Sequence, residues 1–148
     1  AGKLTLSTAE SCTGGYIAHL LTQHAGSSKV FEGGAVTYSN AFKQAVLGVL
    51  AETLDTYGAV SEQTVKEMAL GALLNFKTDY AVAVSGIAGP DGGTDEKPVG
   101  TVWIAVAHQD QVYAKLFNFG NKRTQNIERA ASAALNMVLM QIKAAEAK

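Results

Sequence analysis

The residues that could do chemistry in this sequence begin with Ser11, which lies in the segment AESCTGG at residues 9–15. The preceding residues alternate leucine with small polar side chains, as a strand does, and residues 16–21 have the apolar spacing of a helix. Backbone N–H groups at a helix start attract negative charge. A strand-to-helix turn therefore suits a serine nucleophile with an oxyanion site beside it, and the alternative is a serine that simply caps the helix.

A serine nucleophile needs a base that takes its proton, and the histidines offer no evident candidate. His19, His24 and His108 are scattered; we expect His19 to be a partly buried helix residue and the other two to lie at the surface. A buried lysine with a lowered pKa is the alternative base. Lys43 follows the second expected strand, so it shares a crevice with Ser11 if the first two strands are parallel neighbours. Otherwise Lys43 is an exposed helix lysine.

A glycine-rich segment and an arginine complete the candidate groups. Residues 85–94 (SGIAGPDGGT) follow the most apolar expected strand and contain four glycines. Their backbone N–H groups could hold a phosphate or a carboxylate. The length of the loop favours a functional role, and a plain connection between two strands is the alternative. Arg123 opens the last expected helix and could pair with a phosphate, or it could be a solvated arginine.

Several kinds of site are missing from the sequence. It contains neither a GxxxxGK[ST] phosphate loop nor a GxGxxG motif, and its cysteine and histidines form no cluster with the spacing of zinc ligands. We therefore expect no metal and no cofactor.

The elements that must position these residues alternate between strands and helices. The expected strands cover residues 3–8, 30–39, 80–85, 100–108 and 112–117. The expected helices cover residues 15–24, 40–46, 51–57, 62–76 and 123–147, with Asn40 and Ser61 as N-caps and Leu139 among the inward residues of the last helix. We expect Gly33 and Gly34 to form a bend or a close approach between backbones. The order predicts an α/β protein with helices on both faces of a mixed sheet.

Length and composition limit the classes of protein that remain. The 148 residues, 47% hydrophobic, predict one domain over residues 1–148. A net charge of −1 gives no footprint for nucleic acid, and no apolar stretch approaches the roughly 20 residues of a membrane span. The single cysteine, Cys12, excludes an internal disulfide, and no signal peptide is evident. We expect a cytoplasmic protein.

Six segments in order carry a resemblance to a known family. They are residues 9–15 (AESCTGG), 34–43 (GAVTYSNAFK), 47–49 (LGV), 58–61 (GAVS), 85–94 (SGIAGPDGGT) and 97–102 (KPVGTV). Together they resemble the CinA C-terminal domain family, the nicotinamide-nucleotide amidases, also called nicotinamide mononucleotide deamidases. The resemblance implies a three-layer α/β/α sandwich with a mixed, mostly parallel sheet. It also implies hydrolysis of nicotinamide mononucleotide to nicotinic acid mononucleotide and ammonia in pyridine nucleotide salvage.

The resemblance assigns roles to particular residues. Ser11 is similar to the nucleophile, Lys43 to the general base and Tyr38 to a supporting catalytic residue. We expect the substrate to contact residues of the surrounding segments: Thr13, Gly14, Gly15, Ser39, Ser85, Gly86, Gly89 and Arg123. The sequence departs from the family pattern before the last helix, where Gly-Asp-Arg becomes residues 120–123 (GNKR), and at Ser85, where the family has threonine.

Two other functions stay open beside the amidase. One is an amidase that acts on a different amide, and the other is a non-catalytic nucleotide-binding or regulatory domain. In each case the expected partner is a small-molecule nucleotide or amide, with no nucleic acid and no membrane. The apolar terminal helix also predicts a homo-oligomer, most simply a dimer.

Overall fold

A single five-stranded sheet organises the protein. The computed structural model describes residues 3–148, and residues 1 and 2 of the expected domain lie outside the described residues. The strands are β1 (Leu6–Glu10), β2 (Phe31–Val36), β3 (Tyr80–Gly86), β4 (Thr101–His108) and β5 (Gln111–Asn118). Their spatial order is β2-β1-β3-β4-β5. Strand β1 pairs in parallel with β2 and β3, whereas the β3–β4 and β4–β5 pairs are antiparallel. The sheet is mixed, as expected, and parallel pairing is confined to the half that contains β1.

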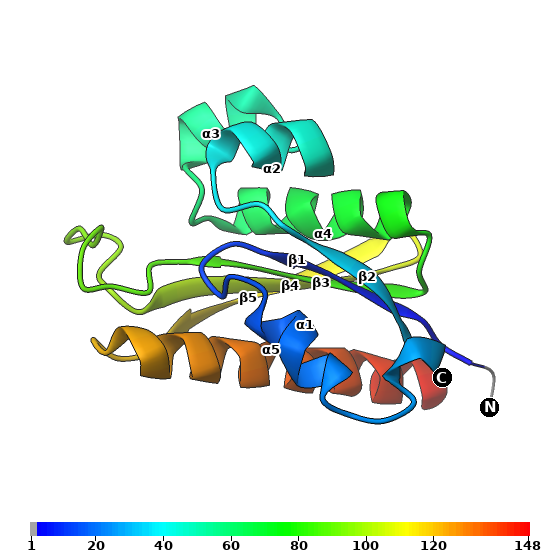
Figure 1. The fold of residues 1–148 in the computed structure, drawn as a ribbon. Helices are drawn as coiled ribbons and strands as arrows, with labels where there is room; N and C mark the ends of the chain where they lie inside the picture. The colour runs from blue at the N-terminus through cyan, green and yellow to red at the C-terminus, as the bar shows by residue number, and fades with distance from the viewer. Residues whose placement is uncertain (1–2) are drawn as a thin grey trace.

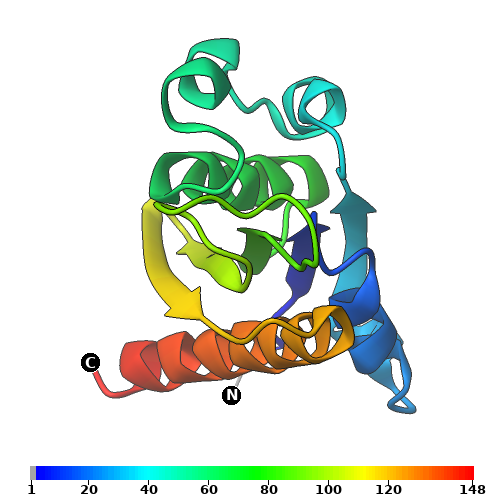
Figure 2. The same cartoon turned by 90° about the vertical axis from the view of Figure 1, so that its left-hand side faces the viewer.

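Helices cover both faces of this sheet. They are α1 (Tyr16–Thr22), α2 (Asn40–Leu47), α3 (Ala51–Tyr57), α4 (Glu62–Phe76) and α5 (Arg123–Glu146), with a 3₁₀ turn at Ser27–Lys29. Helix α4 packs on one face, and α1 and α5 lie on the other (Figure 1). The view turned by 90° shows the sheet between α4 and α5, with α2 and α3 outside α4 (Figure 2). The expected three-layer α/β/α sandwich is confirmed, and α2 and α3 extend it beyond α4.

The two faces of the sheet bury side chains of different size. Because side chains alternate along a strand, β3 and β4 present valine and isoleucine toward α5 and alanine toward α4. The alanines let α4 lie close to the sheet. Helix α2 in turn lies close to α4, since a Cβ on Gly71 would collide with the backbone of Leu47. Small residues thus fix the depth at which α2 sits.

Several element boundaries differ from those expected. Strand β1 covers Leu6–Glu10 rather than residues 3–8, and it therefore ends directly before Ser11. Ser39, and not Asn40, caps α2: its Oγ accepts a hydrogen bond from the N–H of Phe42 at 3.3 Å. The local side-chain bond decides the position of this cap.

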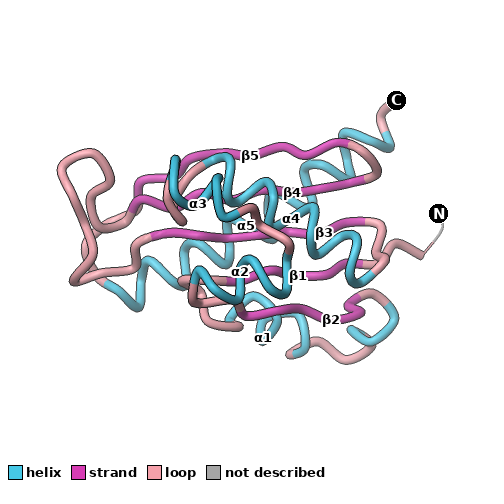
Figure 3. The backbone as a smooth tube through the Cα atoms, turned by 90° about the horizontal axis from the view of Figure 1, so that it is seen from above, coloured by secondary structure: helices cyan, strands magenta, loops and turns pink. Residues whose placement is uncertain are grey.

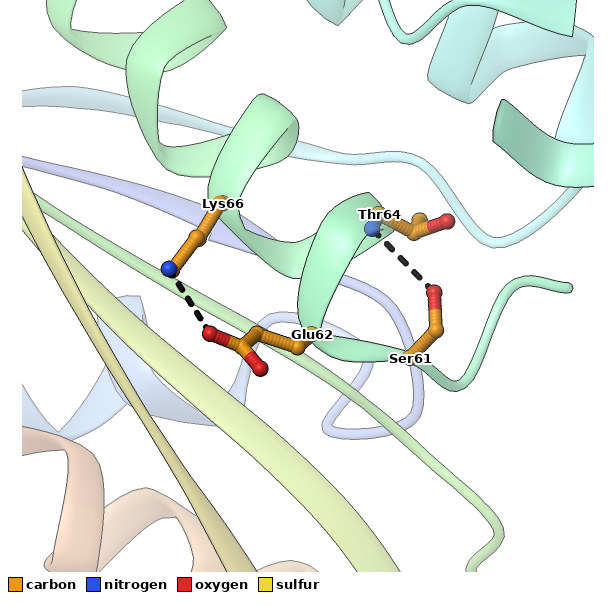
Figure 4. Close-up of polar contacts among 4 residues, drawn as sticks. All are labelled: Ser61, Glu62, Thr64 and Lys66. Atoms are coloured by element: carbon orange, nitrogen blue, oxygen red, sulfur yellow. Dashed lines mark hydrogen bonds and ion pairs between the residues drawn. The ribbon is translucent and has the colours of Figure 1, made fainter. Parts of the chain in front are cut away.

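Helix α4 begins as the sequence predicts. The Oγ of Ser61 accepts a hydrogen bond from the N–H of Thr64 at 3.2 Å, and Glu62 pairs with Lys66 at 2.7 Å (Figure 4). A capping serine followed by an acidic residue in the first turn is favourable at this end of a helix. These local contacts make the start of α4 readable from sequence.

The inward face of α5 was only partly predicted. Leu139 is 48% exposed although its spacing predicts burial, while Asn126 is buried at the start of the helix. The neighbouring chain segments, and not the apolar period alone, decide which residues this helix covers. None of the helices in residues 3–148 combines the length and the apolarity that crossing a bilayer needs.

The carboxyl ends of the parallel strands gather at one end of the molecule. Seen from above, the strands lie side by side, and the long loop between β3 and β4 projects from this end (Figure 3). The start of α5 lies beneath the same end (Figure 1). From β1 the chain passes to β2 on one side and then to β3 on the other, a switch in strand order where open α/β sheets form ligand crevices. The candidate residues of the sequence fall at this end.

Candidate active site

The structure brings Ser11 and Lys43 together as the sequence predicts. Ser11 follows the end of β1, and Lys43 lies on the inward face of α2. The Nζ atom of Lys43 is 2.9 Å from the Oγ atom of Ser11. It also donates to the backbone carbonyls of Thr37, at 2.8 Å, and Tyr38, at 3.1 Å. The lysine side chain is thus held by three oxygens at the end of the sheet.

Burial shapes the electrostatics of this pair. Lys43 is only 1% exposed, and removal of its ammonium from water lowers the pKa of Lys43 below its usual 10.5. Among residues 3–148, no carboxylate lies within ion-pair distance of its Nζ atom. The same burial raises the pKa of the neighbouring Cys12 thiol to about 11. Burial thus disfavours the charged form of both side chains, the ammonium of Lys43 and the thiolate of Cys12.

A cleft of about 240 Å³ opens over the pair. Its lining residues are Ser11, Cys12, Tyr38, Asn40, Lys43, Ala59, Val60, Ser85, Gly86, Ile87, Ala88, Gly89, Asp91, Gly92 and Arg123. A larger groove of about 680 Å³ lies at the other end of the sheet, near the β4–β5 turn, and its lining contains no serine or cysteine. The smaller cleft is the candidate active site because it holds a nucleophile beside a base.

Arg123 joins three chain segments at this cleft. Its Nη1 donates to the carbonyl of Gly89 at 2.7 Å, and its Nη2 donates to the hydroxyl of Tyr38 at 3.2 Å. Nearby, the buried amide of Asn126 donates to the carbonyls of Ala88, at 2.9 Å, and Gly120, at 3.0 Å. The start of α5 thus holds the glycine-rich loop in place. Asn126 was not predicted as a site residue, because an asparagine in a helix carries no signal of the loop that it will contact.

The start of α1 is occupied by a carboxylate that the sequence analysis did not assign. Glu10, fully buried, accepts hydrogen bonds from the N–H groups of Ile17, at 2.9 Å, and Ala18, at 3.0 Å. The hydroxyl of Thr13 donates to the same carboxylate at 2.6 Å. These N–H groups of α1 are therefore not available to an oxyanion, which leaves the N–H groups of the turn before the helix. In residues 3–148 the N–H groups of Cys12, Thr13 and Gly15 have no acceptor, and the first two, which directly follow Ser11, are the candidates that remain for an oxyanion.

A family model described as "CinA C-terminal domain" matches residues 1–142. The chain belongs to this family. A CinA-like protein of Cytophaga hutchinsonii is 52% identical over 139 residues, which are 94% of this chain and 33% of that protein. A nicotinamide-nucleotide amidohydrolase, PncC, of Escherichia coli is 62% identical over 103 residues, 70% of this chain and 62% of that protein.

Family members of known structure share the fold. The crystal structure of the competence/damage inducible protein CihA from Agrobacterium tumefaciens superposes with a TM-score of 0.91 at 48% identity, over 93% of this chain and 85% of that one. The chain spans about a third of the length of the first CinA-like relative. What the longer family members do as whole proteins is therefore a separate question.

The remaining predicted site residues divide into two groups. Ser85, Gly86 and Gly89 line the cleft, and the hydroxyl of Ser85 donates to the carbonyl of Ala59 at 2.8 Å. The others are absent from the lining: Thr13 faces Glu10, Gly14 and Gly15 form the turn, and Ser39 caps α2. Gly14 and Gly15 have φ values of 59° and 100°, which explains the glycine pair without a ligand.

The histidines stand apart from the site. His19 is exposed rather than partly buried, and one of its ring nitrogens lies 3.2 Å from the amide of Gln23. His24 and His108 are also absent from the cleft lining. Among residues 3–148, no three histidine, cysteine, aspartate or glutamate side chains gather closely enough to hold a metal ion. Lys43 is the base that this geometry offers to Ser11.

Proposed function

We propose that this domain hydrolyses the carboxamide of nicotinamide mononucleotide, giving nicotinic acid mononucleotide and ammonia in pyridine nucleotide salvage. One observation carries the proposal: the hydroxyl of Ser11 lies 2.9 Å from a buried lysine nitrogen that has no acidic partner in the described chain. The name of the 62% identical E. coli relative supports the choice of substrate.

The three contacts of Lys43 are those of an ammonium that donates to three oxygens, and they also suit the neutral amine that the reaction needs. A neutral amine has two N–H donors and one lone pair. The carbonyls of Thr37 and Tyr38 can only accept hydrogen bonds, so they take the two donors. In the ammonium form the third N–H donates to Ser11 Oγ; in the neutral form the lone pair faces the same oxygen, whose hydroxyl then donates to it. The arrangement favours proton transfer from serine to lysine, and both carbonyls stabilise the ammonium that results.

The reaction follows from this pair in two stages. Ser11 Oγ attacks the carboxamide carbon while Lys43 takes its proton, and the developing oxyanion accepts hydrogen bonds from the N–H groups of Cys12 and Thr13. Protonated Lys43 then donates its proton to the nitrogen that leaves as ammonia. Water attacks the acyl-enzyme with Lys43 again as the base, which releases the acid and restores Ser11.

Arg123 is the proposed contact for the nucleotide phosphate. Its guanidinium lies at the cleft and uses two donors on Gly89 and Tyr38, and its other N–H groups remain for a phosphate oxygen. Tyr38 supports the site at both ends, since its hydroxyl contacts Arg123 and its carbonyl contacts Lys43. Binding of the remote phosphate then orients the amide at Ser11.

Ammonia release from nicotinamide mononucleotide tests the proposal. We expect turnover by the native chain and a loss of about a thousandfold or more in Ser11→Ala, because removal of a nucleophile leaves only binding and oxyanion stabilisation. Cys12→Ala is the matched neighbour and is expected to retain most of the activity, since its thiol stays protonated. Wild-type turnover in Ser11→Ala would sink the assignment of the nucleophile.

Two further measurements separate the other candidate functions. A panel of free nicotinamide, glutamine and asparagine reveals an amidase with another substrate. Calorimetry that shows tight nucleotide binding with no ammonia release reveals a non-catalytic binding domain. We also propose a cytoplasmic location, which the single unpaired cysteine supports, and a homodimer, which sedimentation analysis tests.

A further inference from the structure

Glu10 is a fully buried carboxylate beside the nucleophile, and the proposed chemistry does not use it. It is the last residue of β1 and is 0% exposed. Its Oε1 accepts from the hydroxyl of Thr13 and the N–H of Ile17, and its Oε2 accepts from the N–H of Ala18. A buried charge needs such donors, and the positive end of a helix adds to them. Glu10 therefore joins the end of β1 to the start of α1.

The segment that Glu10 spans is the turn that carries Ser11. The N–H of Ser11 donates to the carbonyl of Val84 at 3.0 Å, and the N–H of Gly14 donates to the carbonyl of Ser11 at 3.0 Å. Within this turn the hydroxyl of Thr13 points to Glu10 at 2.6 Å. The N–H groups of Cys12 and Thr13 are left without an acceptor in the described chain. The side chain of Glu10 thus holds the turn while leaving the amides of Cys12 and Thr13 unused.

The backbone of Glu10 also supports the lysine side of the site. Its carbonyl accepts from the N–H of Thr37 at 2.9 Å, and the carbonyl of Thr37 accepts from Lys43 at 2.8 Å. One residue therefore connects the turn of the nucleophile with the carbonyl that orients the base. A change at the Glu10 carboxylate reaches the turn directly and leaves this backbone link in place.

We propose that Glu10 is a positioning residue for the reaction. Through Thr13 and the start of α1, its carboxylate fixes the turn at residues 11–15. The Ser11 hydroxyl then faces Lys43, and the amides of Cys12 and Thr13 stay free for the substrate oxygen. The kinetic part of this inference rests on the proposed function, whereas the effect on the turn does not.

The sharpest variant is Thr13→Val, because valine keeps the branched shape and removes only the hydroxyl that contacts Glu10. Thr78→Val is its matched control. Thr78 is also buried, and its hydroxyl lies 2.8 Å from Ser7 Oγ and donates to the carbonyl of Tyr80 at 2.9 Å. Residues 78–80 precede or begin β3, at the end of the sheet away from the cleft. Thr13→Ser restores the hydroxyl, and Glu10→Gln tests the carboxylate itself.

Two readouts are measured on each variant. Hydrogen–deuterium exchange of the amides in residues 11–15 reports the turn without any substrate. Ammonia release from nicotinamide mononucleotide reports kcat and KM. For Thr13→Val and Glu10→Gln we expect faster exchange in the turn and a kcat lower by about 10- to 100-fold, with KM within about twofold, because small misplacements of reacting groups carry costs of this size. Thr13→Ser recovers kcat, and Thr78→Val changes neither readout.

Each outcome decides the inference. Exchange in the turn that stays at the native rate in both Thr13→Val and Glu10→Gln overturns it, and so does an equal loss of kcat in Thr78→Val. A rise in KM at unchanged kcat also overturns it, because that result assigns Thr13 to substrate binding. If the turn loosens as expected while the native chain releases no ammonia, the proposed function fails and the role of Glu10 in fixing the turn stands.

Discussion

Two buried ionisable side chains, Glu10 and Lys43, lie close to the same serine, but the groups that surround them differ. Glu10 receives two backbone N–H groups and a hydroxyl, together with the positive end of α1. Lys43 receives two carbonyls and a hydroxyl but no carboxylate within residues 3–148, and burial lowers its pKa. The buried carboxylate of Glu10, with these three donors, joins the end of β1 to the start of α1. Burial without an opposite charge lowers the pKa of Lys43, which favours the neutral amine that the proposed mechanism uses.

Lys43→Met is the change with the largest expected effect on this contrast. Methionine fills similar space but has no amine, so Ser11 loses the group that takes its proton. We expect kcat for ammonia release to fall by about 10²- to 10⁴-fold, which is the usual contribution of a general base. Circular dichroism should show that the variant keeps the native fold. If Lys43→Met lost less activity than Glu10→Gln, the division between a reactive and a structural group would be wrong.

The pH dependence of activity sharpens the description of Lys43. Only the neutral amine accepts the proton, so kcat/KM should rise with pH, about tenfold per unit below the pKa of Lys43, and level off above it. Because burial lowers the pKa of Lys43 from 10.5, the midpoint should lie below that value. Steady-state assays from pH 5.5 to 10 check this. A midpoint at 10.5, or no rising limb, contradicts the assignment.

Glu10→Gln tests the structural side of the comparison. The amide keeps one oxygen for Thr13 and Ile17 but turns an NH₂ group toward the N–H of Ala18, so a buried donor loses its acceptor. We expect the free energy of unfolding to fall by about 1–3 kcal/mol in urea titrations at pH 7. Lys43→Met should cost less, because it also removes the cost of burying an amine. The reverse order would break the comparison.

The smallest expected effect is the pH dependence of stability that Lys43 contributes. Its pKa is lower in the folded chain than the usual 10.5 of the unfolded chain, so between these two values the unfolded chain binds more protons. The free energy of unfolding therefore rises with pH in this window, by at most about 1.4 kcal/mol per unit, and levels off above 10.5. Urea unfolding of the native chain and Lys43→Met measures it. Curves that stay parallel across the window would falsify the linkage.

The elements were easier to predict from sequence than the contacts between them. Ser61 caps α4 as expected because the signal is local: its hydroxyl accepts a hydrogen bond from the N–H of Thr64, three residues further along the chain. Strand β1 was placed too early, since alternating leucines begin before the residues that pair with β2 and β3. Leu139 was assigned inward from its period, yet it lies at the surface because no neighbouring element covers it. Errors of this kind arise where packing decides.

The candidate site divides in the same way. Ser11 and Lys43 are 32 residues apart, and parallel pairing of β1 with β2 brings them to 2.9 Å. Thr13 and Ser39 were predicted from sequence as substrate contacts, and in the structure their hydroxyl groups contact Glu10 and the start of α2. Glu10 was missed, although a charged residue at the end of an apolar strand, before a strand-to-helix turn, was a signal that could have found it.

The sequence by itself determined the residue types, the alternation of strands and helices, and the family to which the chain belongs. These depend on local periodicity, caps and motifs, which need no partner distant in the chain. Only the tertiary structure decided that Lys43 is buried with no counter-charge among residues 3–148, while Glu10 is buried with three donors. The reason is physical: the charge state of a side chain depends on desolvation and on neighbouring groups, and folding brings both from distant parts of the chain.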